Sequence, residues 1–211
     1  MDGGVAPCGC QEVRRIERLL GQARIPRRYR DASLEGLLMP AGDPIRTALE
    51  RFAKEATPGQ EPCALVLTGA VGVGKTYAAY AVLHAMVARG LAAVAETVPN
   101  VLDTLRATQL SDKGGDLLRG LQQIPVLLLD DLGAHRDSAF VLERLFMVVN
   151  HRYNEMLPTI VTMNGSFADF MRVDPASALG WDRLFSRLQE MAGGFVLEMR
   201  GKDRRLSNGT H

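Results

Sequence analysis

A glycine-rich stretch at residues 67–77, LTGAVGVGKTY, combines residue types that suit phosphate binding. Gly69, Gly74, Lys75 and Thr76 fit the pattern G-x-x-x-x-G-K-[ST]. Glycine lets backbone amides turn inward around phosphate groups, and the start of a helix adds partial positive charge. The lysine would reach the β- and γ-phosphates, and the threonine hydroxyl would bind Mg²⁺. The stretch therefore predicts a site for ATP with Mg²⁺.

The flanks of this stretch favour the same interpretation. Residues 63–67 have the apolar pattern of a buried strand, and residues 75–89 have an amphipathic helical pattern that ends before Gly90. The alternative is a flexible glycine loop, but such a loop would need neither the strand pattern before it nor the helical pattern after it. We expect nucleotide contacts from Gly69, Val71, Gly72, Val73, Gly74, Lys75, Thr76 and Tyr77.

Two adjacent acids follow a second apolar run in the segment IPVLLLDDLG, residues 124–133. In parallel α/β sheets, ligands bind at the carboxyl ends of strands, where these acids would emerge. Adjacent carboxylates repel each other, so they need a cation or hydrogen-bond donors. We expect Asp130 to bind Mg²⁺ and Asp131 to polarise the attacking water. Helix capping by Asp131 is the alternative.

Asn164 follows a further strand pattern at residues 159–162. In the usual strand order it would lie beside the two acids, where it could hold the lytic water or the γ-phosphate. The alternative is a simple turn, because Asn-Gly is a common turn dipeptide.

Two arginines, Arg183 and Arg187, are four residues apart in a helical pattern near the C-terminus. Like charges at this spacing are unfavourable by about 0.2–0.5 kcal/mol, and a bound anion would offset that. The ATP of a neighbouring copy is one such anion, and Arg187 would then act as an arginine finger in trans. A solvated helix face, or pairing with Asp182 and Glu190, is the alternative.

Strand and helix patterns alternate along the chain, which predicts an α/β fold with a parallel sheet covered on both faces. The expected strands are residues 63–67, 91–95, 125–129, 159–162 and 195–199, and the expected helices are residues 11–23, 43–56, 75–89, 99–107, 138–156 and 182–191.

Composition limits the function classes. The 211 residues suit one α/β domain with an N-terminal addition. The net charge of +1 is too small for binding of DNA by bulk charge, so any DNA contact needs a local patch or multivalent binding. We expect a cytoplasmic protein with no membrane contact, because the sequence shows no signal peptide and no spanning segment. Three cysteines are too few for a disulfide framework.

The motifs together resemble the AAA+ core of bacterial DnaC/DnaI-type helicase loaders and of IstB-type transposition helper ATPases. Five segments carry this resemblance, in this order along the chain: the phosphate motif, LLLDDLG, RYNEMLPTIVTMN, FSRL and GKDRR. It implies a P-loop NTPase of the AAA+ type with a five-stranded, mostly parallel sheet and no separate large lid domain. Residues 22–37 are similar to the segment that flanks the adenine in this family. We expect residues 1–34 to form an N-terminal helical extension and residues 35–211 the ATPase domain.

The resemblance also implies roles for individual residues. These are Lys75 and Thr76 in Walker A, Asp130 and Asp131 in Walker B, Asn164 as sensor 1, Arg187 as the arginine finger, and Arg205 at the sensor 2 position, with Arg204 as its substitute.

The family's helical insertion before Walker B, which is implicated in assembly and in contact with single strands, corresponds to residues 98–121. Arg106, Lys113 and Arg119 are its candidate DNA ligands, although the segment offers no aromatic platform for bases and its arginines could equally be solvated.

One departure concerns the family's N-terminal zinc module. This chain keeps only Cys8 and Cys10 of that module. A structural zinc site needs four ligands, so we expect no zinc.

These observations predict an ATP-hydrolysing homo-oligomer that acts in DNA replication as a helicase loader. Its partners would be a replicative helicase and single-stranded DNA. Three alternatives stay open: an IstB-like helper that serves a transposase on duplex DNA, a nucleotide-dependent binding switch with little turnover, and a P-loop kinase for a small metabolite. The paired acids weigh against the kinase, which needs no water activator.

Overall fold

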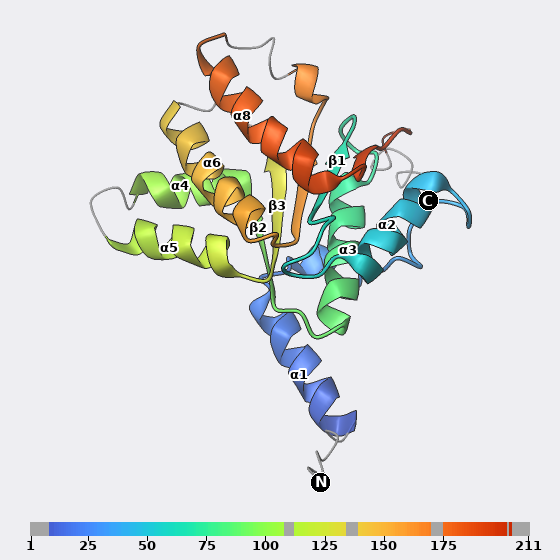
Figure 1. Cartoon of the computed structure of the whole chain (residues 1–211). Helices are drawn as coiled ribbons and strands as arrows, with labels where there is room; N and C mark the ends of the chain where they lie inside the picture. The colour runs from blue at the N-terminus through green and yellow to red at the C-terminus, as the bar shows by residue number, and fades with distance from the viewer. Residues whose placement is uncertain (1–8, 108–111, 134–138, 170–174, 202, 204–211) are drawn as a thin grey trace.

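One five-stranded parallel sheet organises the chain (Figure 1). The computed structural model describes residues 9–107, 112–133, 139–169, 175–201 and 203. The strand order is β2-β3-β4-β1-β5. The strands are β1 (Ala64–Thr68), β2 (Ala93–Thr97), β3 (Val126–Leu132), β4 (Thr159–Met163) and β5 (Val196–Glu198).

Helices cover both faces of this sheet. The side chains of α2 and α3 pack in one apolar cluster, and those of α4, α5, α6 and α8 pack in another on the opposite face. The helices are α1 (Gly9–Gln22), α2 (Pro44–Glu55), α3 (Lys75–Ala88), α4 (Val98–Ala107), α5 (Asp112–Gln123), α6 (Ala139–Asn154) and α8 (Pro175–Ala192), with a short 3-10 helix η1 (Arg27–Tyr29).

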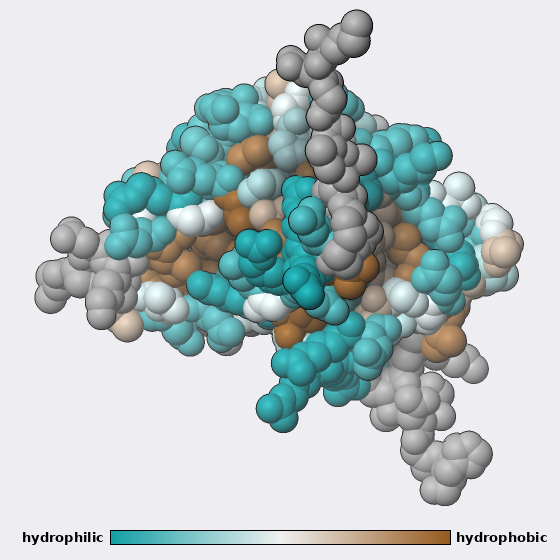
Figure 2. All heavy atoms as spheres, turned by 90° about the horizontal axis from the view of Figure 1, so that it is seen from below, coloured by the Kyte–Doolittle hydropathy of each residue, from teal (hydrophilic) through white to brown (hydrophobic). Residues whose placement is uncertain are grey.

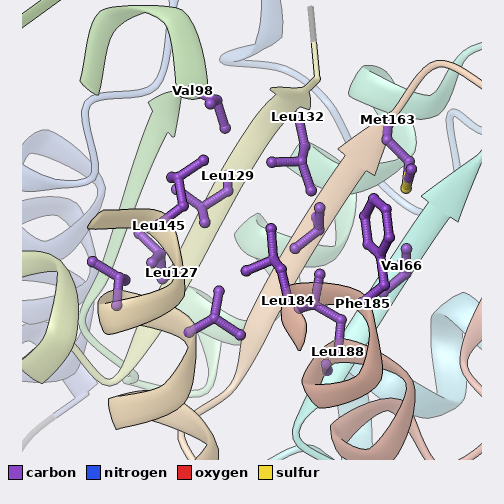
Figure 3. Close-up of a cluster of buried hydrophobic side chains, with 14 of the residues drawn as sticks. Val66, Val98, Leu127, Leu129, Leu132, Leu145, Met163, Leu184, Phe185 and Leu188 are labelled. Atoms are coloured by element: carbon purple, nitrogen blue, oxygen red, sulfur yellow. The ribbon is translucent and has the colours of Figure 1, made fainter. Parts of the chain in front are cut away.

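The central strands are apolar on both faces because they alternate between the two clusters. Leu127 and Leu129 of β3 point to the cluster that includes Leu145 and Leu184 (Figure 3), and Leu128 points to the opposite one. Side chains alternate across a strand, so a strand with helices on both sides must be apolar throughout. This is why the pattern could be read from the sequence.

The N-terminal segment is attached to the edge of the sheet. Helix α1 extends away from the body in Figure 1, while Leu19 and Leu20 at its end pack against the α3 side of the core. The Ala95 amide of β2 donates to the Ala23 carbonyl over 2.9 Å. This hydrogen bond pairs one backbone amide of β2, which lies at the edge of the sheet and would otherwise present unpaired backbone groups on that side.

The side chain of Arg152 in α6 lies at the amino end of the sheet. Its side chain is fully buried, and burial lowers its pKa to about 9, so it is cationic at neutral pH. Its guanidinium donates over 2.6–3.4 Å to the carbonyls of Leu121, Gln122, Ile124, Pro125 and Pro158 and to Thr159 Oγ1. These acceptors lie at the end of α5 and at the starts of β3 and β4, so one side chain joins three elements.

Two helices differ from the expected ones. α8 begins at Pro175, seven residues before the expected start at 182, and α5 is a helix separate from α4. Glycines weaken both patterns, at Gly180 in α8 and at Gly114, Gly115 and Gly120 in α5. Burial of Trp181, Leu118 and Leu121 against the core offsets that weakness.

Seen from below, the surface is mostly hydrophilic, with smaller apolar patches between the polar side chains (Figure 2). In the described part of the chain, no helix has both the length and the apolar character needed to cross a bilayer.

Cys63 is buried before β1, and burial raises the pKa of its thiol to about 11. This thiol is therefore protonated at neutral pH.

Candidate functional site

The phosphate loop connects β1 to α3. Gly74 caps the helix in a left-handed conformation (φ +102°) and has no side chain to bond the first amides of α3. Those amides are therefore available to an anion at the start of the helix. Of the two valines in the loop, Val73 is buried and Val71 is 52% exposed.

Lys75 lies beneath this loop and is nearly buried. Its Nζ donates to the carbonyls of Gly69 (2.9 Å) and Ala70 (2.7 Å) and to Asn164 Oδ1 (2.9 Å). The ammonium group therefore joins the loop to the end of β4. It lies where it can also face a phosphate held by the loop amides.

A β-bulge in β3 arranges the two adjacent acids. The register between β3 and β4 shifts between Leu129 and Leu132, and Asp131 has a left-handed backbone (φ +64°). A bulge re-aims side chains that strict alternation would send to opposite faces. An aspartate in this conformation carries strain, which is common at functional sites.

Asp130 accepts two hydroxyl hydrogen bonds at Oδ1. The donors are Thr76 Oγ1 at 3.0 Å and Thr162 Oγ1 at 2.5 Å. Burial raises the pKa of Asp130, and these two hydrogen bonds oppose that rise. The removal of the carboxylate from water is therefore the larger effect at this site.

The pair of Thr76 and Asp130 fits Mg²⁺. A hydroxyl and a carboxylate are hard oxygen donors, and Mg²⁺ takes only one or two protein ligands when phosphates and water supply the rest. Among the described residues there is no group of three or more His, Cys, Asp or Glu side chains suited to a metal ion. A site that shares its metal with a nucleotide does not need such a group.

Asn164 connects the lysine to the second acid. Its Nδ2 donates to Asp131 Oδ1 at 2.9 Å while its Oδ1 accepts from Lys75. The following Gly165 donates its amide to the Gly69 carbonyl over 3.4 Å. The Asn-Gly dipeptide thus bends the chain after β4, pairs with the phosphate loop at Gly69, and brings an amide side chain into contact with the site.

Tyr77 joins the site to the N-terminal segment. Its hydroxyl accepts a long hydrogen bond from the Ser33 amide (3.4 Å) and lies so close to Gly36 that a side chain at Gly36 would overlap it. Part of segment 22–37 therefore packs directly beside the residue that follows Thr76.

The C-terminal arginines lie elsewhere or outside the described residues. The Arg187 guanidinium stacks on the Tyr153 ring, 4.3 Å from its centroid, and lies 3.5 Å from Glu190. Arg183 stacks on Phe146 at 4.2 Å. The two ring contacts join α8 to α6 and not to the phosphate loop, and the contact with Glu190 lies within α8. Arg204 and Arg205 lie outside the described residues.

The candidate DNA ligands of the helical insertion have acidic neighbours. Arg106 pairs with Asp103 on α4 at 3.2 Å, and Arg119 pairs with Asp116 on α5. The side chain of Lys113 lies outside the described residues, as do Cys8 and the side chain of Cys10.

Sequence reasoning missed two residues at this site. Thr162 donates to Asp130 and accepts the Asp131 amide over 2.9 Å. Its position two residues before Asn164, near the end of the expected strand, was an available signal, because residues two apart in extended chain share a face. Asp203 lies against Gly72 in the loop, and no local pattern indicates this contact.

Comparison with known proteins identifies the family. The model of the IstB-like ATP-binding proteins matches residues 55–208. The chain belongs to this family. The resemblance to helicase loaders and transposition helpers is thereby confirmed.

Similar proteins come from both groups. A protein of insertion sequence IS1162 from Pseudomonas fluorescens, described as ATP-binding, is 36% identical over 58% of this chain and 52% of its own length. The replicative helicase loader DnaI of Bacillus subtilis is 28% identical over 59% of this chain and 42% of its own length. This chain thus spans about half of each relative.

A solved structure shows the same fold. The crystal structure of DnaI has a TM-score of 0.74 and 28% identity, and the match covers 89% of this chain and all of that one. The expected AAA+ P-loop fold, with a five-stranded sheet flanked by helices, is confirmed.

Proposed function

We propose that this IstB-like protein binds Mg·ATP at the phosphate loop and hydrolyses it. The observation that carries the proposal is one connected set of polar contacts. Lys75 donates to Asn164, Asn164 donates to Asp131, and Thr76 donates to Asp130. Thr162 connects the two acids, since its hydroxyl donates to Asp130 and accepts from the Asp131 amide. These side chains come from three elements, α3, β3 and the end of β4. They meet beside amides suited to phosphate groups.

Each of these residues has a distinct role in the proposal. The loop amides and Lys75 neutralise the charge on the phosphates, and Thr76 and Asp130 hold Mg²⁺, which would stabilise charge on the phosphate oxygens. Asp131 polarises the attacking water, and Asn164 holds the Asp131 carboxylate in place. Positioning and fixed charge then supply most of the rate acceleration.

Hydrolysis would depend on assembly. In the proposal Arg187 of one copy reaches the ATP of the next, so the site is complete only in a homo-oligomer. Arg187 lies on the Tyr153 ring and beside Glu190, away from its own phosphate loop, so in this proposal it would exchange these contacts for the ATP of the next copy. Residues 35–211 would form the ATPase unit, and Arg205 would contact the nucleotide from the C-terminal segment.

The work done by hydrolysis would be the loading of a replicative helicase on single-stranded DNA. The likeness to the helicase loader DnaI supports this. The second candidate is a transposition helper that serves a transposase on duplex DNA, which the IS1162 relative supports equally. Immobilised protein incubated with a purified helicase and a purified transposase should retain one of them in an ATP-dependent way.

The first test is nucleotide binding by the parent and by Lys75→Ala. The parent should bind Mg·ATP, and the variant should bind it at least about tenfold more weakly, since a charge-assisted contact contributes roughly 1.5–3 kcal/mol. Equal binding by both proteins would contradict the proposed site.

The second test is phosphate release with and without single-stranded DNA. Release of free phosphate by the parent supports hydrolysis, whereas binding without release indicates a nucleotide-dependent switch. Transfer to a small acceptor would indicate a kinase. Arg187→Ala should stop release and keep nucleotide binding, while Arg183→Ala, one helical turn away, should have the smaller effect. Unchanged turnover in Arg187→Ala would rule out the trans role.

A further inference from the structure

Two residues that follow β5, Met199 and Asp203, lie against the phosphate loop. The Met199 amide donates to the Thr68 carbonyl over 2.8 Å, and the Met199 carbonyl lies against Gly69. Four residues later, the Asp203 carboxylate lies against Gly72. The loop is therefore packed between α3 and a segment that is distant in the sequence.

Both contacts occupy the space where a loop side chain would begin. A side-chain carbon added at Gly69 would overlap the Met199 carbonyl, and one added at Gly72 would overlap both oxygens and the carboxyl carbon of Asp203. Gly72 also has a positive φ of +82°. The Met199 backbone therefore favours glycine at position 69 independently of phosphate, whereas at Gly72 the positive φ favours glycine and the Asp203 side chain could turn aside.

The position of Asp203 has an electrostatic consequence. The loop gathers amide dipoles and the Lys75 ammonium, an arrangement that attracts anions. A carboxylate in contact with Gly72 places negative charge beside the same loop. Such a charge lowers the attraction for phosphate groups, and the effect is strongest where water is partly excluded.

We propose that Asp203 limits the affinity of this site for nucleotide through its negative charge. This inference rests on the proposed nucleotide site and adds a residue that sets how tightly that site holds its ligand. Binding of a polyphosphate has to overcome the carboxylate or displace it from Gly72.

The test measures binding of AMPPCP·Mg²⁺ and ADP·Mg²⁺ to the full chain by titration calorimetry. Asp203→Asn should bind both about 3- to 30-fold more tightly than the parent, as expected for removal of one charge a few ångströms away. Asp203→Ser, which also removes the charge, should behave alike, and Asp203→Glu should not tighten binding. The gain in nucleotide affinity over the parent should shrink as the salt concentration rises, because ions screen the partly exposed carboxylate.

Glu55→Gln is the matched control, since it removes one exposed carboxylate at the end of α2. It should leave the affinity unchanged. Equal or weaker binding by both Asp203→Asn and Asp203→Ser, while the parent binds, overturns the role of Asp203. If neither the parent nor these variants bind, the nucleotide site itself is wrong, and the inference fails with it.

Discussion

At the amino end of the central sheet Arg152 is buried among backbone carbonyls, whereas at the carboxyl end Asp130 is buried among the hydroxyls of two threonines. The acceptors around Arg152 are mostly fixed backbone groups. One of the donors around Asp130 is Thr76, which a nucleotide-bound metal would also use. The amino end is thus complete within the chain, and the carboxyl end is arranged for a ligand.

This difference has an energetic meaning. A buried ionic group stabilises the fold only when its hydrogen-bonding capacity is fully used. Arg152 meets that condition with six acceptors. Asp130 does not, because in the described part of the chain its two hydrogen bonds both fall on Oδ1. Burial accordingly raises its pKa. We therefore expect substitutions at the two ends to separate stability from activity.

The largest expected effect is at the amino end. Arg152→Met should lower the free energy of unfolding by about 5 kcal/mol, because several buried carbonyls lose their donor at once. Urea denaturation measures this, and Arg152→Lys, with only three donors, should lie between. Arg89→Met is the matched control, since Arg89 also donates to carbonyls but is partly exposed. A loss below about 1 kcal/mol for Arg152→Met would contradict the comparison.

The next effect is at the carboxyl end and concerns activity. Asp131→Asn should slow phosphate release by about 10²- to 10⁴-fold, the usual contribution of a general base. Its free energy of unfolding should stay within about 0.5 kcal/mol of the parent, because asparagine tolerates the left-handed backbone at this position. Asp131→Ala should lose both activity and stability. Turnover that survives Asp131→Asn would remove the water-activating role.

The sequence predicted the parts of the molecule that depend on local pattern. Each of the five strands was expected at or within two residues of its observed start, because burial on both faces leaves a continuous apolar run. The phosphate loop and its helix were likewise readable, since glycine, lysine and threonine act there within eight consecutive residues.

The remaining features depend on tertiary contacts. The bulge at Asp131 needs pairing of β3 with β4. The hydrogen bonds of Arg152 need the end of α5 and the starts of β3 and β4 to lie together. Asp203 contacts a loop more than 120 residues earlier in the chain. No local propensity encodes such contacts.

A smaller effect tests how β4 holds the two acids. Thr162→Val keeps the shape of the side chain and removes both its donor to Asp130 and its acceptor for the Asp131 amide. We expect turnover to fall about tenfold, with a higher Mg²⁺ concentration needed for half-maximal rate, because each lost hydrogen bond contributes about 1 kcal/mol. Thr162→Ser should restore most of the activity. Equal activity of the valine and serine variants would show that the hydroxyl is not needed.

The smallest expected effect has the opposite sign to that of Arg152→Met. Asp130→Asn should raise the free energy of unfolding of the nucleotide-free protein by about 1 kcal/mol at pH 7, because the buried charge is removed while the amide oxygen still accepts from Thr76 and Thr162. The pKa of Asp130 is raised in the folded state, so the parent loses stability as pH rises above the carboxyl's ordinary value. The difference in the free energy of unfolding between variant and parent should therefore shrink as pH falls from the raised pKa toward the ordinary value, and stay constant below it. Denaturation with EDTA present, at several pH values, measures it. A variant less stable than the parent at pH 7 would show that Asp130 stabilises the fold as Arg152 does, and the contrast between the two ends of the sheet would not hold.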